Sequence, residues 1–453
     1  MFERKKIIVV GGNAAGPAAA AKAKRTDPDA EVILFEAADF ISTGTCELPY
    51  VISGEIEDYE KIVYFDPDTF FRKKGVKVFT KHLVENINIR QKKITVKNLA
   101  SSDYTQFQYD KLILTTGSKA KTIPNLSTDL ENVFTLKSVS DLVKIKGFIE
   151  TRPVKKVLII GAGYIGLETA EAFVKQNYEV SILEITDLPM PEGEQEVSNL
   201  ILELIRKNNV KFLSSAKNTK FNIENNKLVS IKYNGRFIEF DLVVVAVGVK
   251  PNADIGLTSK LELGKFGGFK VDSKLKTSDP NIFAAGDNIE VINKITGRPD
   301  YMPVATVAHD YAHIAGANAA GANEHAKPVI KNIAVKIFDR AYCQVGLSTK
   351  QAKTFNYKIK TVYAIAYNLV KVMPESRKVF GKVIYETENK NILGAAFLGG
   401  QETIGYADLV SSLIYNKAPV TALAEINYNY TPPYSPFVNL LSVLGRKIKE
   451  EIK

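Results

Sequence analysis

A strand–helix–strand pattern occurs twice in the chain, and its two copies lie about 150 residues apart. In each copy a short apolar run leads into a glycine-containing turn, followed by a helix, a second apolar run and a glutamate. Uninterrupted apolar runs of this length are typical of strands buried on both faces of a parallel sheet. We therefore expect two βαβ units, comprising strand 7–10, turn 11–16, helix 17–25 and strand 31–35, and then strand 156–160, turn 161–166, helix 167–176 and strand 179–183.

The pattern changes near residue 327. Before it, apolar strands end in glycine turns, and an alanine-rich stretch predicts one long helix over 301–323. After it, β-rich segments precede a helix and a tail rich in aromatic residues and proline. The expected elements are strand-and-turn segments at 112–118, 242–248 and 280–287, strands at 333–337, 357–367, 379–385 and 392–398, and a helix at 406–416.

Both glycine turns carry the spacing of a dinucleotide-binding fingerprint. Its glycines permit a tight turn, close approach of the backbone to a pyrophosphate and close helix–strand packing, and the helix N-terminus offers free N–H groups to the phosphates. A carboxylate 25 or 23 positions beyond the first glycine can accept hydrogen bonds from ribose hydroxyls. The first copy comprises Gly11, Asn13 in place of the middle glycine, Gly16 and Glu36, and the second Gly161, Gly163, Gly166 and Glu184.

Composition excludes several classes of protein. Hydrophobic residues form 45% and charged residues 24% of 453 positions, as in an ordinary globular protein with two or three domains. Two cysteines and four histidines are too few for a disulfide scaffold or a zinc cluster. No apolar run approaches the roughly 18 residues of a membrane span, no signal-peptide pattern precedes the first strand, and no Lys/Arg block suggests a nucleic-acid arm. We expect a cytoplasmic protein with no nucleic-acid partner and no membrane span.

The net charge of +10 has two explanations. A basic surface attracts anionic ligands such as dinucleotides or coenzyme A. It also occurs in proteins that bind nothing of the kind, so the charge does not decide between them.

Taken together, these motifs resemble the pyridine nucleotide-disulfide oxidoreductases over essentially the whole chain. The resemblance implies an α/β fold with two Rossmann-like dinucleotide-binding domains and a C-terminal α+β dimerisation domain. It places the first part of the FAD domain at 1–118, the NAD domain at 119–248, the second part of the FAD domain at 249–326 and the dimerisation domain at 327–453. It implies FAD and NAD(P)H as cofactors and a homodimer as the assembly.

The same resemblance assigns residues to each cofactor. Gly11, Asn13, Gly16 and Glu36 would hold the adenosine diphosphate of FAD, and Asp287 its ribityl chain. Thr116, Gly117, Gly248 and Gly286 are expected to complete the cofactor sites at the ends of their strands. Gly161, Gly163, Gly166 and Glu184 would hold the nicotinamide dinucleotide. Because Glu184 would repel a 2′-phosphate and neither Ile185 nor Thr186 supplies an arginine, the sequence favours NADH over NADPH.

Cys46 is the predicted redox residue. The segment from Ser42 to Tyr50 resembles the motif of the family's single-cysteine subgroup, which contains coenzyme A-disulfide reductases, persulfide and polysulfide reductases, and NADH oxidases and peroxidases. Val51 occupies the place of a second cysteine, so the oxidised sulfur must be a mixed disulfide, a persulfide or a sulfenic acid. A helix starting near Cys46 would lower the thiol pKa, whereas Glu47 would raise it. Without this motif, Cys46 would be a small buried hydrophobic residue.

Two further groups are candidates for the reaction with the acceptor. Tyr430 matches a tyrosine that assists sulfur chemistry across the dimer of coenzyme A-disulfide reductases, and Ser42 belongs to the cysteine motif. Tyr430 equally fits an aromatic segment that packs at an interface. Lys22 and Arg25 end the first helix, where they could meet the phosphates of coenzyme A or simply form a solvated basic helix end.

The sequence thus predicts an FAD-dependent NAD(P)H oxidoreductase that reduces a coenzyme A-type disulfide, a persulfide or a polysulfide through Cys46, to which coenzyme A itself could be bound. The alternatives are an NADH oxidase that reduces O2 through a cysteine sulfenic acid, a redox sensor that signals to a partner, and a reductase of a small electron-carrier protein. Ala14 stands where the oxidase and peroxidase branches usually carry a histidine, and Val372 to Glu375 lack the second tyrosine motif of the coenzyme A branch.

Overall fold

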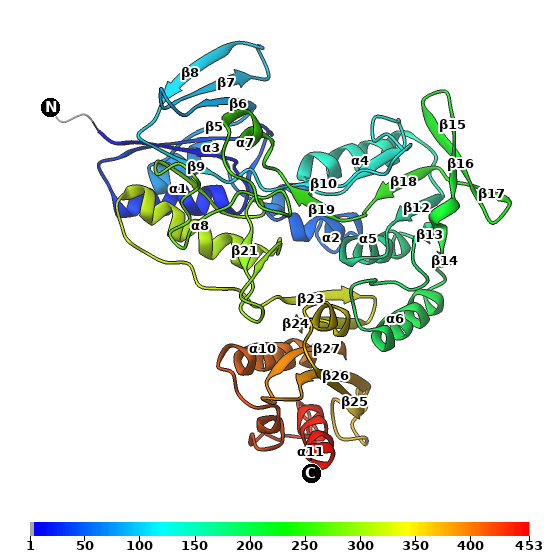
Figure 1. Cartoon of the computed structure of the whole chain (residues 1–453). Helices are drawn as coiled ribbons and strands as arrows, with labels where there is room; N and C mark the ends of the chain where they lie inside the picture. The colour runs from blue at the N-terminus through cyan, green and yellow to red at the C-terminus, as the bar shows by residue number, and fades with distance from the viewer. Residues whose placement is uncertain (1–3, 453) are drawn as a thin grey trace.

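The computed structural model describes residues 4–452 and contains three sheet-centred units (Figure 1). The first unit holds a parallel five-stranded sheet, in which β1 runs between β2 and β9. Its strand order is β20 (Ile282–Ala284), β9 (Lys111–Leu114), β1 (Lys6–Val10), β2 (Glu31–Phe35) and β5 (Lys77–Phe79). Because every inward position of β1 is apolar and fully covered, this strand forms the centre of the largest core cluster.

Two helices pack closely beside this sheet. Helix α1 (Ala15–Thr26) follows the first glycine turn and α8 (Ala305–Ala320) lies against it. The expected helix over 301–323 is shorter, because Pro303 leaves 301–304 extended and Gly321 at φ +120° ends the last turn. The unit also contains β3 (Ile41–Thr43), α2 (Leu48–Ile52), β4 (Val63–Phe65), α3 (Pro67–Lys74) and an antiparallel sheet of β6 (His82–Asn88), β7 (Lys93–Asn98) and β8 (Tyr104–Gln108).

The second unit repeats this plan. Its parallel sheet has the order β11 (Val133–Thr135), β18 (Leu242–Val245), β12 (Lys156–Ile160), β13 (Glu179–Leu183) and β14 (Lys211–Leu213). Its helices are α4 (Val139–Thr151), α5 (Tyr164–Lys175) and α6 (Gln195–Lys207), and β15 (Lys220–Glu224), β16 (Lys227–Tyr233) and β17 (Arg236–Glu239) form a small antiparallel sheet. Both repeated βαβ units are therefore where the sequence predicts them.

Two short strands join these units. β10 (Ser118–Ala120) pairs antiparallel with β19 (Val249–Pro251), where the chain leaves and re-enters the first unit. The predicted boundaries at 118 and 248 lie beside this pair, and the division of the chain at these residues stays a prediction. The returning segment adds α7 (Asp254–Ser259) and the β21 (Val291–Ile292) and β22 (Pro299–Asp300) hairpin.

The third unit is an antiparallel sheet with helices on one side (Figure 1). Its strand order is β23 (Asn332–Ile337), β24 (Arg340–Gly346), β27 (Ile392–Gly399), β26 (Lys378–Glu386) and β25 (Ile359–Tyr367). Helices α10 (Glu402–Tyr415) and α11 (Leu440–Ile452) pack on the sheet, and α9 (Thr349–Thr354) follows β24. This mixture of two parallel α/β units and a C-terminal α+β unit confirms the predicted fold class. Within 4–452, no helix is both long and apolar enough to cross a membrane.

Candidate active site

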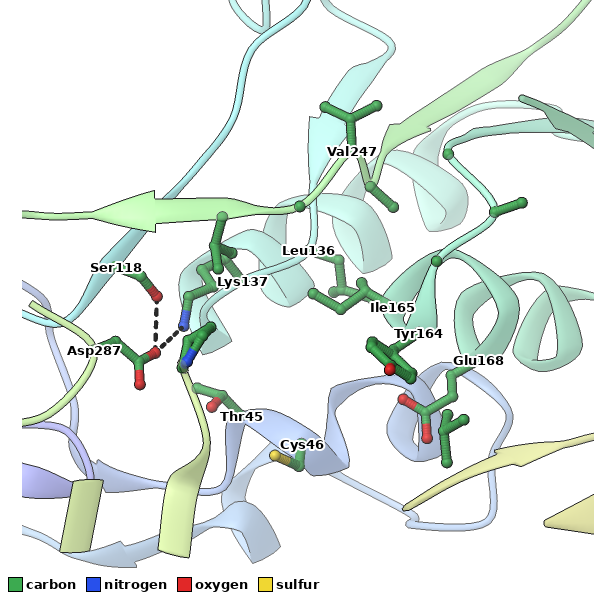
Figure 2. Close-up of a pocket in the computed structure, with 18 of the residues that line it drawn as sticks. Thr45, Cys46, Ser118, Leu136, Lys137, Tyr164, Ile165, Glu168, Val247 and Asp287 are labelled. Atoms are coloured by element: carbon green, nitrogen blue, oxygen red, sulfur yellow. Dashed lines mark hydrogen bonds and ion pairs between the residues drawn. The ribbon is translucent and has the colours of Figure 1, made fainter. Parts of the chain in front are cut away.

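One large cavity of about 1450 Å³ lies where the three units meet. It exceeds the roughly 300–1,000 Å³ of a typical small-molecule pocket, so it has room for more than one such ligand. The cavity is lined by both glycine turns, by the Cys46 segment and by the start of β23. Figure 2 shows Asp287 and Lys137 on one side, Tyr164 and Glu168 on the other, and Cys46 below them.

The first glycine turn is tight because its glycines lie against backbone carbonyl groups, with no room for a Cβ atom. Gly11 has φ +106°, and a Cβ there would collide with the Thr115 carbonyl, while a Cβ on Gly16 would collide with the Gly11 carbonyl. The Glu36 carboxylate accepts hydrogen bonds from the N–H groups of Gly12 and Ala38. Burial raises the pKa of Glu36 despite these backbone hydrogen bonds. The turn thus offers backbone N–H groups to a pyrophosphate and a carboxylate to the adjoining ribose, as a dinucleotide requires.

Asn13, which replaces the middle glycine, has a structural role of its own. Its Oδ1 accepts hydrogen bonds from the Thr43 N–H at 3.1 Å and the Thr43 hydroxyl at 3.0 Å. The Ser42 N–H also donates to the Gly12 carbonyl at 2.8 Å. The glycine turn and the segment that carries Cys46 are therefore fixed to each other.

The second glycine turn has the same construction. Gly161 has φ +106°, and its missing Cβ would collide with the Ala246 carbonyl. The buried Glu184 carboxylate accepts from the Ala162 N–H at 2.8 Å and from the Thr186 N–H and hydroxyl at 3.0 Å. Glu184 and Ile185 both line the cavity, so a carboxylate and an apolar side chain face an incoming ribose.

Cys46 lies in a 3₁₀ turn, Thr45–Glu47, which leads into the five-residue helix α2. Its side chain is exposed to the cavity. Surrounding protein atoms nevertheless raise the thiol pKa by desolvation, and the Glu47 and Glu168 carboxylates raise it further. Lys137 acts in the opposite direction. Of the two opposing effects expected from the sequence, the increase caused by Glu47 is found, and burial of the thiol adds a larger increase that the sequence does not predict.

Asp287 has two polar partners at the cavity wall. The Ser118 hydroxyl donates to its Oδ2 at 2.9 Å, and the Lys137 Nζ lies 3.9 Å from the same oxygen (Figure 2). Lys137 precedes α4, whose N-terminus is fixed by a capping box between Ser138 and Asp141. The cavity therefore brings one ammonium group close to both Asp287 and Cys46.

Glu168 and Tyr164 come from one face of α5, since they are four residues apart. The Tyr164 ring stacks on buried Tyr342 of the third unit, with centroids 6.3 Å apart. Glu168 accepts a hydrogen bond from the Tyr50 hydroxyl at 3.2 Å. Desolvation raises the pKa of Glu168 to about 7, although the Tyr50 hydrogen bond acts to lower it.

Half of the predicted site residues line the cavity and the others do not. Gly11, Gly16, Gly166, Glu36 and Thr116 form or support the turns behind the lining. The Ser42 hydroxyl is buried without a hydrogen-bond partner, outside the lining. The C-terminal half of α1, away from the cavity, carries Arg25 and Lys22, and Lys22 pairs with Glu324. Tyr430 lies on the surface of the third unit. The residues within the lining are Asn13, Cys46, Gly117, Gly161, Gly163, Glu184, Gly248, Gly286 and Asp287.

Sequence reasoning missed Lys137, Glu168 and Tyr50 as residues of this site. Lys137 lies two residues after β11, and the carboxyl ends of parallel strands are where ligands bind. Glu168 lies one turn after Tyr164 in the glycine motif, so helical spacing could have identified it. The contact of Tyr50 with Glu168 spans 118 positions and has no local signal.

The residues present fit a dinucleotide at each turn. Any side chain at the crowded glycines would displace backbone, and a carboxylate stands at the end of the adjoining strand in both units, partly buried at Glu36 and buried at Glu184. Asn288, next to Asp287, is fully buried and fixes this segment, because its Nδ2 donates to the Leu114 carbonyl at 2.9 Å and to the Thr116 hydroxyl at 3.1 Å. No group of three metal-ligating side chains occurs in the described part of the chain.

Two dinucleotide turns and a cysteine on one cavity define a two-nucleotide oxidoreductase. A family model described as pyridine nucleotide-disulphide oxidoreductase matches residues 5–312, and the family's dimerisation domain matches 312–439. The chain belongs to the pyridine nucleotide-disulphide oxidoreductase family. The family depends on FAD and a pyridine nucleotide, which confirms the predicted cofactors and enzyme class.

Three relatives show the range of chemistry around this chain. A coenzyme A disulfide reductase of Staphylococcus aureus is 31% identical over 445 residues, which are 98% of this chain and 100% of that protein. An NAD-dependent persulfide reductase of A. fulgidus is 28% identical with a TM-score of 0.93, covering 98% of this chain and 83% of the other. A water-forming NADH oxidase of Lactobacillus brevis is 27% identical with a TM-score of 0.89, covering 99% of each chain.

Proposed function

We propose that this enzyme uses NADH to reduce a low-molecular-weight disulfide, a persulfide or a polysulfide through Cys46, with coenzyme A species as carriers. The observation that carries this proposal is the position of Cys46, exposed in the cavity that both dinucleotide turns share. The relatives that reduce coenzyme A disulfide and persulfide support the choice of acceptor.

The first glycine turn, Glu36 and Asp287 would hold FAD, which when bound supplies two-electron transfer between a nicotinamide and a sulfur. The second turn would hold NADH, with Glu184 accepting from its adenosine ribose. NADH fits better than NADPH because Glu184 is buried and would repel a 2′-phosphate.

Cys46 carries the sulfur chemistry. Its thiolate attacks a disulfide RSSR, releasing one thiolate RS⁻ and forming the mixed disulfide Cys46–S–S–R. Two electrons from NADH then break this bond and return the Cys46 thiolate and the second thiol. Because burial and Glu47 raise the thiol pKa, the Lys137 ammonium is the group in this cavity that favours the thiolate.

The proposal also covers the assembly of the enzyme, its location in the cell and the boundaries of its domains. The dimerisation domain over 312–439 supports a homodimer. Within this homodimer, Tyr430 of each subunit would serve the other subunit's cavity. We place the enzyme in the cytoplasm and divide the chain at residues 118, 248 and 326. Lys22 and Arg25 would meet the nucleotide end of coenzyme A.

Replacing Cys46 tests the function directly. In Cys46→Ser we expect NADH-dependent reduction of coenzyme A disulfide and polysulfide to fall to background, because the attacking sulfur is gone. Reduction of ferricyanide by NADH should persist, because it needs no cysteine. Cys343→Ser is the matched control, since Cys343 is buried beside Thr403 and should leave both activities intact.

Two results would contradict the proposal. Unchanged disulfide and polysulfide turnover in Cys46→Ser would exclude the cysteine mechanism. Rapid O2 consumption by the wild type, together with a sulfenic acid on Cys46 and no thiol adduct by intact mass, would instead identify an NADH oxidase. Ala14 lines the cavity at the position where that branch carries a histidine, so we expect slow O2 consumption.

A further inference from the structure

A stripe of polar side chains runs along α5 from the cavity to the surface. Tyr164, Glu168, Glu171 and Lys175 are spaced by four, three and four residues, so they occupy one face of the helix. Tyr164 and Glu168 line the large cavity. Glu171 is 4% exposed, whereas Lys175 reaches solvent. The stripe therefore leads from the reaction site outward.

Glu168 is surrounded by titratable groups from four elements. Tyr50 of α2 donates to its carboxylate, Lys336 of β23 acts through its backbone N–H and its charge, and Glu171 lies on its own helix. Cys46, in the 3₁₀ turn before α2, is close enough to be affected by its charge. Burial is the largest effect and brings the pKa of Glu168 to about 7, so this carboxyl changes charge near neutral pH. Burial also raises the pKa of Tyr50 above its ordinary value, which keeps the phenol protonated and able to donate.

A second, small cavity lies on the far side of Glu168. Its volume is about 10 Å³, which is close to what one water molecule needs. The residues around it offer several polar partners for such a water, namely Tyr50, Ser53, Glu55, Glu168, Glu171 and Lys175. Glu171 is buried, and its Oε1 lies 2.9 Å from Lys175 Nζ and 3.2 Å from Lys336 Nζ. This carboxylate therefore ties the small cavity to two ammonium groups that reach solvent.

Charged side chains surround the solvent-facing end of the α5 stripe. Glu55 Oε1 pairs with Lys336 Nζ at 3.1 Å and with Lys175, and all three side chains are more than one third exposed. The Lys336 Nζ lies 5.6 Å from the centre of the Tyr50 ring. Tyr50 and the small cavity therefore connect a carboxyl facing the reaction site with groups in free exchange with water.

We propose that Glu168 passes protons between the active-site cavity and solvent, through Tyr50 and a water held in the small cavity. The proposal rests on the proposed function, because disulfide reduction consumes a proton: RSSR + NADH + H⁺ gives 2 RSH + NAD⁺. The S–S bond and the nicotinamide C–H bond break, two S–H bonds form, and one proton must come from outside. With nucleotide and disulfide filling the large cavity, the α5 stripe offers a route that neither ligand blocks.

The direction of the pH dependence follows from the role of Glu168 as proton donor. Its carboxylic acid form is the active one and predominates below pH 7, so kcat for disulfide reduction should fall as pH rises through about 7. The glutamine of Glu168→Gln cannot release a proton, so we expect a kcat about 100-fold lower. The plot of kcat against pH should also lose its break, the bend near neutral pH that marks the titration of Glu168. Tyr50→Phe removes a hydrogen bond that lowers the Glu168 pKa, so its break should move to higher pH while kcat decreases.

Kinetics of the FAD-loaded enzyme test this scheme when kcat is measured across the neutral range. Tyr357→Phe is the matched control, because it also loses a tyrosine hydrogen bond, to the Ile295 carbonyl, away from both cavities. It should keep the wild-type profile. A wild-type break that persists in Glu168→Gln, or a Tyr50→Phe profile whose break stays in place, would overturn the relay.

Infrared titration of the resting protein gives a readout that is independent of turnover. We expect a protonated-carboxyl C=O band that disappears as pH rises through about 7 in the wild type and is missing in Glu168→Gln. Absence of this band from the wild type would overturn the relay. A wild type that shows the band yet reduces no disulfide with NADH would instead refute the proposed function, and the two failures are thereby distinguished.

Discussion

The reactivity of Cys46 depends in part on its neighbour Glu47, whose Oε1 accepts a hydrogen bond from the Tyr64 hydroxyl at 3.1 Å. This contact holds the carboxylate near the thiol, whose pKa it raises. The residue therefore limits the thiolate fraction at neutral pH.

Replacing Glu47 should make Cys46 more reactive. In Glu47→Gln the thiol pKa should fall, because a negative charge is removed beside a group that becomes negative. We expect alkylation of Cys46 by iodoacetamide at neutral pH to become severalfold faster, with the rate–pH curve displaced to lower pH.

Glu57→Gln is the control for this measurement. Glu57 is an exposed carboxylate on the following loop, and it pairs with Lys61 rather than with the Cys46 segment. Its replacement should leave the alkylation curve in place. An unchanged curve in Glu47→Gln would show that Glu47 does not contribute to the thiol pKa.

Single residues also show how far the site could be predicted. Cys46, Asp287 and the glycines are recognisable because the chemistry fixes their local motifs. Lys137 and Tyr50 are not, because their roles arise from contacts with residues more than 100 positions away. The raised pKa of Glu168 depends on burial by several elements, and no sequence window contains that information.

At the scale of elements, the contact between α1 and α8 supports the first glycine turn. A Cβ on Gly316 of α8 would collide with the Ala19 carbonyl of α1, so the two helices touch through backbone. Since α1 begins directly at the turn, displacement of this helix would move the N–H groups that face the dinucleotide.

Gly316→Ala should therefore weaken cofactor retention. We expect a lower Tm, consistent with an overpacking cost of about 1–3 kcal/mol, and a lower ratio of flavin to protein after gel filtration. Gly147→Ala is the control, because Gly147 lies inside α4 with open space around it. There, alanine should be neutral or stabilising by about 0.5–1 kcal/mol. Equal flavin content in both variants would contradict the role of this contact.

Elements differ in how well the sequence predicts them. The sequence predicts the four strands of the two βαβ units almost to the residue, because they are continuous apolar runs beside glycine turns. It does not predict the three-residue strands β5, β11 and β14 of the same sheets, which are too short to form a recognisable apolar run. Helix α10 begins at Glu402 rather than at 406, since its first turn lacks the apolar spacing that marks the rest. The small antiparallel sheets, such as β15–β17, are largely exposed and offer little periodic pattern to detect.

At the scale of the molecule, the third unit presents a set of exposed apolar side chains. Val372 is 89%, Tyr434 83% and Phe437 76% exposed, and Tyr430 packs edge-on against Phe437 at 5.3 Å. Several large apolar side chains exposed within one short segment, as at Tyr430, Tyr434 and Phe437, are typical of an interaction surface. It accords with the match of residues 312–439 to the dimerisation domain.

If Tyr430 serves the partner's cavity, two inactive variants should complement each other. Cys46→Ser and Tyr430→Phe homodimers should each reduce coenzyme A disulfide poorly. A mixed dimer combines Cys46 of one subunit with Tyr430 of the other at one of its two sites. We expect dimers assembled from an equal mixture to recover up to about a quarter of wild-type activity, since half of the dimers are mixed and each has one intact site.

The control for complementation is a mixture of Cys46→Ser with a Cys46→Ser, Tyr430→Phe double variant, which can form no intact site. Recovery in this control would point to wild-type contamination. No recovery in the first mixture, with subunit exchange verified by differential tagging, would show that Tyr430 acts within its own chain or not at all.

The two glycine turns resemble each other beyond their motif. In each, the first glycine has φ +106° and faces the carbonyl of a strand that comes much later in the chain, Thr115 in one case and Ala246 in the other. In each, the terminal glutamate binds the N–H that follows this glycine. The two α/β units therefore build the same turn from segments that share few residues. A side chain added at Gly11 or at Gly161 should deform its turn through the same kind of collision with a backbone carbonyl.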